Sequence, residues 1–378
     1  MEQEKGRGKV PFPGGHLVSV VRIGLSVALR LLPALLCALP VFFSSSLAYP
    51  QPRTVPLSSP PILSLSYPRG RLTLAAGGAP LRLYLLSKRS GSLDRIDPEN
   101  GQSIRRLSSL PSPEDLAVGP GGERIMISLD SSRRLLVLPV SAGPPLSLTV
   151  GLNPGQIAKS SNGTLYLAAR AVHIVYRLSP DHSHTTDWMA VGDVFRQMSP
   201  DGKGDLWLPL SRGEQIVDLD AEHLRIRKSY DLESCRKPTR VLPLSGGGFV
   251  VGCRNALLSE DLSGEDVARV RLPSFRRGGG VRDMLGLPGG DRLMVSFRKR
   301  KILNVYHLPD LSMISSFRTH YLPVRLYLFD GWSILFVVMD DPDHDKTWLF
   351  GYPLSAFGSL FVTKPASGPF TSSPRITP

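Results

Sequence analysis

Asn162-Gly163-Thr164-Leu165-Tyr166-Leu167 is one copy of a turn-and-strand pattern that recurs along most of this 378-residue chain. In each copy a polar or glycine-rich turn precedes a short apolar strand, a basic residue, a second apolar strand and another turn. Short strands joined by glycine-containing hairpin turns at a period of roughly 40 residues are typical of β-propellers. The other copies begin at Gly121, Asp201, Gly246, Gly289 and Asp330, and an earlier one keeps only Leu83-Tyr84-Leu85.

The repeat predicts an all-β fold, a seven-bladed β-propeller of four-stranded antiparallel blades. The turns that close the second strands fall near Asp97, Val140, Ser179, Asp220, Asp261, Pro309 and Pro353. Counting strands from the propeller axis outward as A to D, the second unit is expected to use residues 113–119, 124–129, 135–140 and 146–150. The segment Ile62–Tyr67 is a candidate for the strand that closes the ring, beside Leu360–Val362, because an open ring would expose two unpaired sheet edges.

The ends of the chain do not carry the repeat. Residues 1–48 are predicted to be a signal peptide, because a basic region precedes an apolar stretch over 23–43 and small residues ending at Ala48. The alternative is an uncleaved membrane anchor formed by residues 23–43. Residues 49–63 are expected to be a proline-rich linker, residues 64–366 the propeller, and residues 367–378 a flexible tail. The propeller is therefore predicted to be periplasmic or extracellular.

Cysteine usage agrees with export. Removal of the leader takes away Cys37 and leaves Cys235 and Cys253, which are predicted to form a disulfide. Such a bridge would close a loop of roughly 18 residues and contribute about 3 kcal/mol of stability in the chain-entropy model.

The units resemble those of the YVTN-type and NHL-like propeller superfamily, which includes streptogramin-lyase-like repeats. The similarity rests on strands such as Thr164–Leu167 and on second strands that end in a turn, such as Ile174–Pro180, and it spans residues 71–363. The resemblance implies the propeller architecture. It leaves the activity open, because this superfamily contains binding scaffolds, lactone hydrolases and lyases.

Arginine and lysine residues recur at one position of the repeat. The formal net charge is +13, and removing the leader takes away five basic and two acidic residues and leaves +10. Loops between strands B and C share a face with the start of strand A, so their cations should surround the mouth of the central channel. These loop cations are Lys88-Arg89, Arg133-Arg134, Arg170, Arg212, Arg254 and Arg298-Lys299-Arg300-Lys301. Loops between strand D and the next strand A add Arg236-Lys237 and Arg276-Arg277.

The starts of the A strands complete the predicted ligand site. Several guanidinium groups that converge on one mouth would attract carboxylate, sulfate or phosphate groups. The expected partners are an anionic small molecule, an acidic polysaccharide or an acidic protein surface. Nucleic acid is not expected, because export removes the chain from it, and membrane contact is expected only through an uncleaved leader. The predicted ligand-binding residues are Arg196, Arg240, Arg282, Arg325, Gln156, Arg254 and Arg298, with Asp115 at the matching position of the second unit.

Two other functions remain open, a lyase or lactonase that uses the channel mouth and a structural scaffold of the cell envelope. Catalysis would need a histidine or a carboxylate pair at the mouth. The sequence carries no nucleophile elbow, phosphate loop, dinucleotide fingerprint or haem-attachment motif, so no cofactor is expected. No metal site is expected either: the loop Asp340–Asp345 reads as a solvated acidic loop that neutralises part of the basic rim, and His182 and His184 as surface residues of a polar turn.

Overall fold

The computed structural model describes residues 54–361 apart from positions 58, 78–81, 99, 142, 152, 170, 196, 273–278, 330 and 331. For residues 359–361 it describes the backbone but not the side chains. The predicted signal peptide and tail lie outside these residues. Within the described range, no helix is long and apolar enough to cross a membrane.

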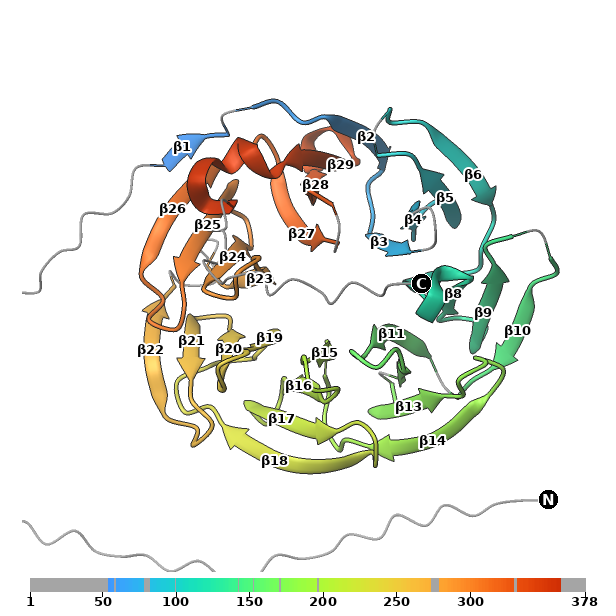
Figure 1. Ribbon diagram of the computed structural model, residues 1–378, viewed down its shortest axis with the longest axis horizontal. Coiled ribbons are helices and arrows are strands. Elements are labelled where there is room, and N and C mark those ends of the chain that lie inside the picture. The colour runs from blue at the N-terminus through green and yellow to red at the C-terminus, as the bar shows by residue number, and fades with distance from the viewer. Residues whose placement is uncertain are drawn as a thin grey trace, which may run out of the picture. The chain divides into compact units, whose positions relative to one another are not determined.

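Seven small sheets stand around a central axis, with successive strands running outward (Figure 1). The predicted seven-bladed, all-β fold is therefore confirmed. Blades 1 to 3 comprise β3 (Leu72–Gly77), β4 (Arg82–Ser87), β5 (Ser92–Ile96) and β6 (Ser103–Leu107); β7 (Pro113–Val118), β8 (Arg124–Leu129), β9 (Arg134–Pro139) and β10 (Leu146–Thr149); and β11 (Pro154–Lys159), β12 (Leu165–Ala169), β13 (Ile174–Leu178) and β14 (Thr185–Ala190).

The remaining blades follow the same order, and two of them recruit a strand from the start of the described chain. Blades 4 and 5 comprise β15 (Ser199–Pro200), β16 (Leu206–Leu210), β17 (Gln215–Asp220) and β18 (Arg225–Asp231); and β19 (Arg240–Pro243), β20 (Phe249–Gly252), β21 (Ala256–Glu260) and β22 (Asp266–Arg271). Blades 6 and 7 comprise β23 (Val281–Gly286), β24 (Arg292–Phe297), β25 (Ile302–His307), β26 (Met313–Arg318) and β1 (Thr54–Pro56); and β27 (Leu322–Leu328), β28 (Ile334–Asp341), β29 (Lys346–Pro353) and β2 (Leu63–Pro68).

Strand β2 closes the ring by pairing antiparallel with β29, so an N-terminal strand becomes the outermost strand of the last blade. The predicted closing segment is therefore correct, but the predicted partner at residues 360–362 is wrong. Residues Leu354–Phe361 form a 3₁₀ helix instead, because β29 already occupies the third position of the blade. Within the predicted linker, β1 adds a parallel strand to the edge of blade 6.

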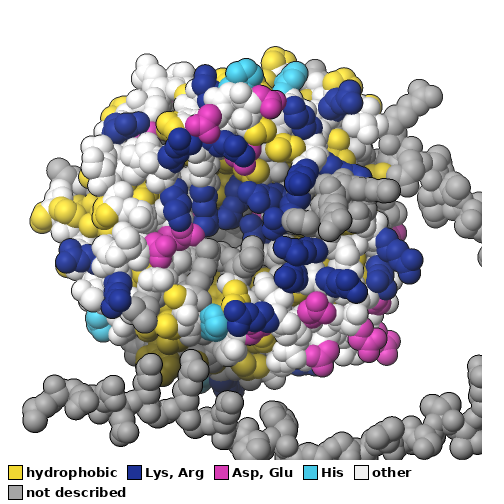
Figure 2. Space-filling model, turned by 180° about the vertical axis from the view of Figure 1, so that it is seen from behind, with side chains coloured by type: hydrophobic (Ala, Val, Ile, Leu, Met, Phe, Trp, Pro, Cys, Tyr) yellow, Lys and Arg dark blue, Asp and Glu magenta, His cyan; other side chains and the backbone are white. Residues whose placement is uncertain are grey.

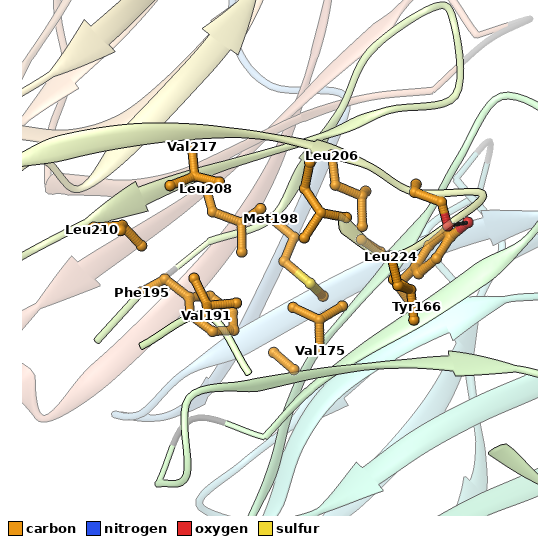
Figure 3. Packing of buried hydrophobic residues seen from close by; sticks show 14 residues of the cluster. Tyr166, Val175, Val191, Phe195, Met198, Leu206, Leu208, Leu210, Val217 and Leu224 are labelled. Carbon is orange, nitrogen blue, oxygen red and sulfur yellow. Dashed lines mark hydrogen bonds between the residues drawn. The ribbon is translucent and has the colours of Figure 1, made fainter. Parts of the chain in front are cut away.

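The core lies between neighbouring sheets. Side chains of β12 and β13 in blade 3 pack on those of β16 and β17 in blade 4, where Phe195 and Met198 fill the space near the axis (Figure 3). Each inner strand is covered on both faces by the neighbouring sheets. The B strands, second from the axis, are therefore almost continuously apolar, as in Leu83–Leu86 of β4. Burying one such side chain contributes about 1.5–3 kcal/mol.

A tight hairpin turn requires glycine at Gly248. Its φ is 78°, a left-handed conformation, and a β-carbon there would lie 2.3 Å from the carbonyl oxygen of Glu260. The turn of blade 5 therefore approaches its partner strand too closely for any side chain.

Candidate anion-binding site

One face of the ring carries a cavity of about 710 Å³ around the propeller axis. Figure 2 shows lysine and arginine side chains gathered around the centre of one face of the molecule. Four of the predicted site residues meet in this cavity, Arg240, Arg282, Arg298 and Arg325, which come from strands β19, β23 and β27 and from the loop after β24. Among the described residues, the arginines that line it are Arg69, Arg71, Arg89, Arg240, Arg282, Arg298 and Arg325.

A second cavity of about 500 Å³ shares Val194, Thr239 and Arg298 with the first, so the two are neighbours. The loop that follows β20 contributes the predicted residue Arg254, and the connection between β18 and β19 contributes Lys237. In the part of the lining that the structure describes, the charged residues are Arg212, Lys237, Arg254 and Arg298 and the carboxylate Glu214.

Two predicted site residues are not among the lining residues of these cavities. Arg196 lies outside the described residues. Gln156 uses its side-chain amide to join blades 3 and 4: Nε2 donates to the carbonyl oxygen of Met198 at 3.0 Å, and the Met198 amide donates to Oε1 at 2.6 Å. The Gln156 side chain therefore holds two blades together at the channel wall.

Carboxylates at the start of two A strands also join blades. The pairing of β7 with β8, and of β23 with β24, shifts register by one residue just before Asp115 and Asp283. Such bulges re-aim a side chain. Asp115 Oδ2 accepts the amide of Ile157 in blade 3, and Asp283 Oδ2 accepts the amide of Leu326 in blade 7, each at 2.9 Å.

Carboxylates offset the positive charge of several basic residues at the channel mouth. Arg240 Nε donates to Asp283 Oδ1 at 2.7 Å. Arg71 and Lys88 both contact the buried Glu114. Burial lowers the pKa of Arg240 to about 10, although the neighbouring Asp283 opposes the change.

Arg282 and Arg325 are different, because within the described residues neither guanidinium has a hydrogen-bond partner. Burial lowers the pKa of Arg282, opposed by Asp340. Burial also lowers the pKa of Arg325, but Tyr327 and then Asp283 raise it by more, so that its pKa lies above the usual value. Both side chains therefore present charged donors to the cavity.

The acidic loop of blade 7 is predicted to be solvated and to offset part of the rim; Asp341 is buried instead, whereas Asp345 does offset one rim cation. Asp345 accepts from Arg89 Nη1 at 2.9 Å, and Asp341 accepts from the ring of His344 at 2.8 Å. Throughout the described residues, no group of three or more metal-ligating side chains is present.

The prediction that His182 is a surface residue is wrong. It is only 6% exposed and lies close to Gly119 of blade 2. Burial first, and the charge of Arg124 second, lower the pKa of its imidazole. The polar sequence of the turn concealed this contact because it is made with the neighbouring blade.

The predicted disulfide is present between Cys235 and Cys253, with Cα atoms 5.5 Å apart. It joins the connection that carries Lys237 to the loop that carries Arg254. The same two segments are also paired directly, since the Arg254 amide donates to the carbonyl oxygen of Arg236 at 2.9 Å.

Sequence reasoning missed the acids that compensate the mouth. Glu114 and Asp283 immediately neighbour predicted positions, Asp115 and Arg282, so the repeat alignment did contain a signal for them. It missed Arg69 and Arg71 because they precede β3 in the most degenerate unit.

Comparison with known proteins identifies the architecture only. No protein-family model and no curated protein matches the chain. Among solved structures, virginiamycin B lyase from Staphylococcus aureus matches with a TM-score of 0.59 at 12% identity over 76% of this chain and 98% of that one.

Proteins of other functions match equally well. Hydrazine synthase from Kuenenia stuttgartiensis matches with a TM-score of 0.62 at 13% identity over 76% of this chain and 96% of that one. A chain of a mitotic checkpoint complex matches with a TM-score of 0.63 at 12% identity over 88% of this chain and all of that one. At these identities the similarities establish the fold alone: the chain is a seven-bladed β-propeller.

Proposed function

We propose that this protein is an exported propeller that binds an anionic ligand in the arginine-lined cavity. The observation that carries the proposal is the pair Arg282 and Arg325, which enter the cavity without a hydrogen-bond partner within the described residues. Two confined cations repel each other, and an anion would relieve that repulsion while accepting charge-assisted hydrogen bonds. The disulfide supports export, because such bridges persist in oxidising compartments.

The arrangement of the acids favours binding over catalysis. A general base needs a carboxylate or histidine that is available to the substrate. Of the carboxylates in the described lining, Asp340 accepts from the hydroxyl of Thr347 and Asp345 accepts from Arg89. The acids beside the cavity are engaged as well: Asp283 accepts from Arg240 and Leu326, Glu114 contacts Arg71 and Lys88, and Asp115 accepts from Ile157. The described lining of the cavity contains no histidine.

Titration calorimetry with phosphate, sulfate and citrate tests the proposal. We expect binding that weakens as salt is added, because mobile ions screen charges. Arg282→Ala should weaken binding by about 1.5–3 kcal/mol, the value of a hydrogen bond to a charged group. Arg269→Ala, on the outer strand β22, is the matched control and should leave the affinity unchanged. If none of these anions binds the wild-type protein, the proposal is wrong.

A further inference from the structure

We infer that the natural ligand is an extended acidic peptide segment of another protein, which spans both cavities. The inference rests on the proposed function and specifies its partner. Three observations carry it: the continuity of the two cavities, the link between the backbone segments that carry the cations of the second, and the kind of side chains that lie between the charges.

The cavities form one elongated basic surface. They share Arg298, so a ligand whose first anionic group meets Arg282 and Arg325 reaches Arg254 and Lys237 by extending past it. A single small anion bound by Arg282 and Arg325 would not contact the second group of cations, Lys237 and Arg254. A chain with regularly spaced carboxylates engages both, since successive residues of an extended peptide advance about 3.3 Å.

The backbone positions that carry the second group of cations, Lys237 and Arg254, are tied to each other. Lys237 lies two residues from one half-cystine, and Arg254 directly follows the other. The side chain of Asn255 ties the segments further: its Oδ1 accepts the amide of Arg236 at 2.8 Å, and its Nδ2 donates to the carbonyl oxygen of Ser234 at 3.0 Å. Because the two segments are tied, a ligand that binds both cations loses little entropy in ordering the backbone that carries them.

The side chains between the charges suit a peptide better than a sugar chain. Val194 and Val324, both half-buried, place apolar surface beside the arginines. The aromatic residue of the described lining, Phe195, is only 1% exposed and offers no open ring face for stacking. Clusters of arginine are an established way of recognising acidic peptide motifs, and their guanidinium groups bind carboxylates in bidentate fashion.

The test compares a short and a long peptide of alternating glutamate and valine with a short and a long oligogalacturonate, each matched in charge to the corresponding peptide. Binding is measured for the wild type, for Arg282→Ala, for the double variant Lys237→Asn/Arg254→Gln and for the outer-strand control Arg269→Ala. Asparagine is chosen at position 237 because Lys237 has a φ of 53°, a left-handed conformation that asparagine tolerates. Arg212→Gln, on an exposed side chain of the same cavity, is a second variant in case the double variant does not fold.

We expect the long peptide to bind at least about tenfold more tightly than the short one, a difference of about 1.4 kcal/mol. Lys237→Asn/Arg254→Gln should abolish this gain without changing the affinity for the short peptide, and Arg212→Gln should reduce it. Arg282→Ala should weaken the binding of both peptides, and Arg269→Ala the binding of neither.

Three outcomes overturn the inference: no gain with peptide length, a gain that survives in the variants of the second cavity, or an equal and equally sensitive gain for the oligogalacturonate. In each of these cases, continued binding of phosphate and of the short peptide leaves the anion-binding proposal intact. Failure of every anion to bind overturns both.

Discussion

Asp283 connects three consecutive blades through one carboxylate. It accepts the guanidinium of Arg240 in blade 5 and the backbone amide of Leu326 in blade 7, and it belongs itself to blade 6. Arg240 and Asp283 are both nearly buried. Arg240, predicted from the sequence as a ligand-binding residue, therefore also has a structural role.

We expect Arg240→Ala to lower the free energy of unfolding by about 3 kcal/mol, because removing one partner leaves a buried charge uncompensated. Arg282→Ala lines the same cavity and removes no hydrogen bond within the described residues, so its effect on stability should stay within about 0.5 kcal/mol. Urea denaturation of both variants measures the difference. Equal stabilities would show that the ion pair contributes nothing to the connection between blades.

Glu260, at the end of β21, makes the folding stability of the protein depend on pH. The side chain is 3% exposed, and within the described residues its Oε2 has no hydrogen-bond partner. Burial first, and then the charges of Asp266 and Asp261, raise its pKa from 4.5 to about 7. Between these two values the folded protein holds a proton that the unfolded chain releases, so stability should fall as the pH rises through this window.

Glu260→Gln removes this titration and keeps the shape of the side chain. We expect the variant to be more stable than the wild type above pH 7, on the order of 1–2 kcal/mol, and equally stable at about pH 4. Thermal unfolding across this pH range provides the measurement. A difference between the two proteins that does not change with pH would rule out Glu260 as the group responsible.

At the scale of strands, the sequence predicts regular elements well and their irregularities poorly. The predicted strands of the second unit agree with β7 to β10 to within about one residue, because hairpin turns and apolar runs are local signals. Strand β15, in contrast, is only Ser199–Pro200, although the repeat placed the start of that strand near Phe195. Phe195 forms an isolated bridge with Leu210, so the innermost strand of blade 4 is interrupted.

The same limit explains how much of the candidate site could be predicted. Arginines at equivalent positions of the repeat are visible in the sequence, and four of them do meet in one cavity. Whether a neighbouring carboxylate turns toward the mouth depends on a bulge of one residue, as at Asp115 and Asp283. A shift of one residue reverses the face of every side chain that follows it, and no local sequence signal marks it.

At the scale of the molecule, the net charge of +13 does not tell how many cations at the channel mouth lack a neighbouring carboxylate. The sequence suggests arginines that repel one another around the axis. In the structure, Glu114, Asp283 and Asp345 offset individual cations, whereas Arg282 and Arg325 have no hydrogen-bond partner within the described residues and are the pair that the proposed ligand would compensate. Charge composition predicts the sign of the partner, whereas the pairing of side chains decides which residues hold it.

Closure of the ring is the property of the molecule that depends most on a distant segment. Strand β2 pairs with β29, about 280 residues later in the chain, and Leu63 of β2 is 3% exposed in a cluster with Leu72 and Phe336. We expect Leu63→Ala to lower the free energy of unfolding by about 2–5 kcal/mol, the cost of truncating a buried leucine. The adjacent Ile62 is 52% exposed, so Ile62→Ala is a matched control that should change stability by less than about 0.5 kcal/mol.

Urea denaturation checks this prediction when it is followed by the fluorescence of Trp207 in a background in which Trp188, Trp332 and Trp348 are replaced by phenylalanine. Strand β16, which carries Trp207, lies far along the ring from blade 7 (Figure 1). If the closed ring unfolds as one unit, the truncation at Leu63 should move the transition that Trp207 reports. An unchanged midpoint for that probe, with β2 alone becoming sensitive to protease, would mean that the closing strand detaches independently and that the blades do not share their stability.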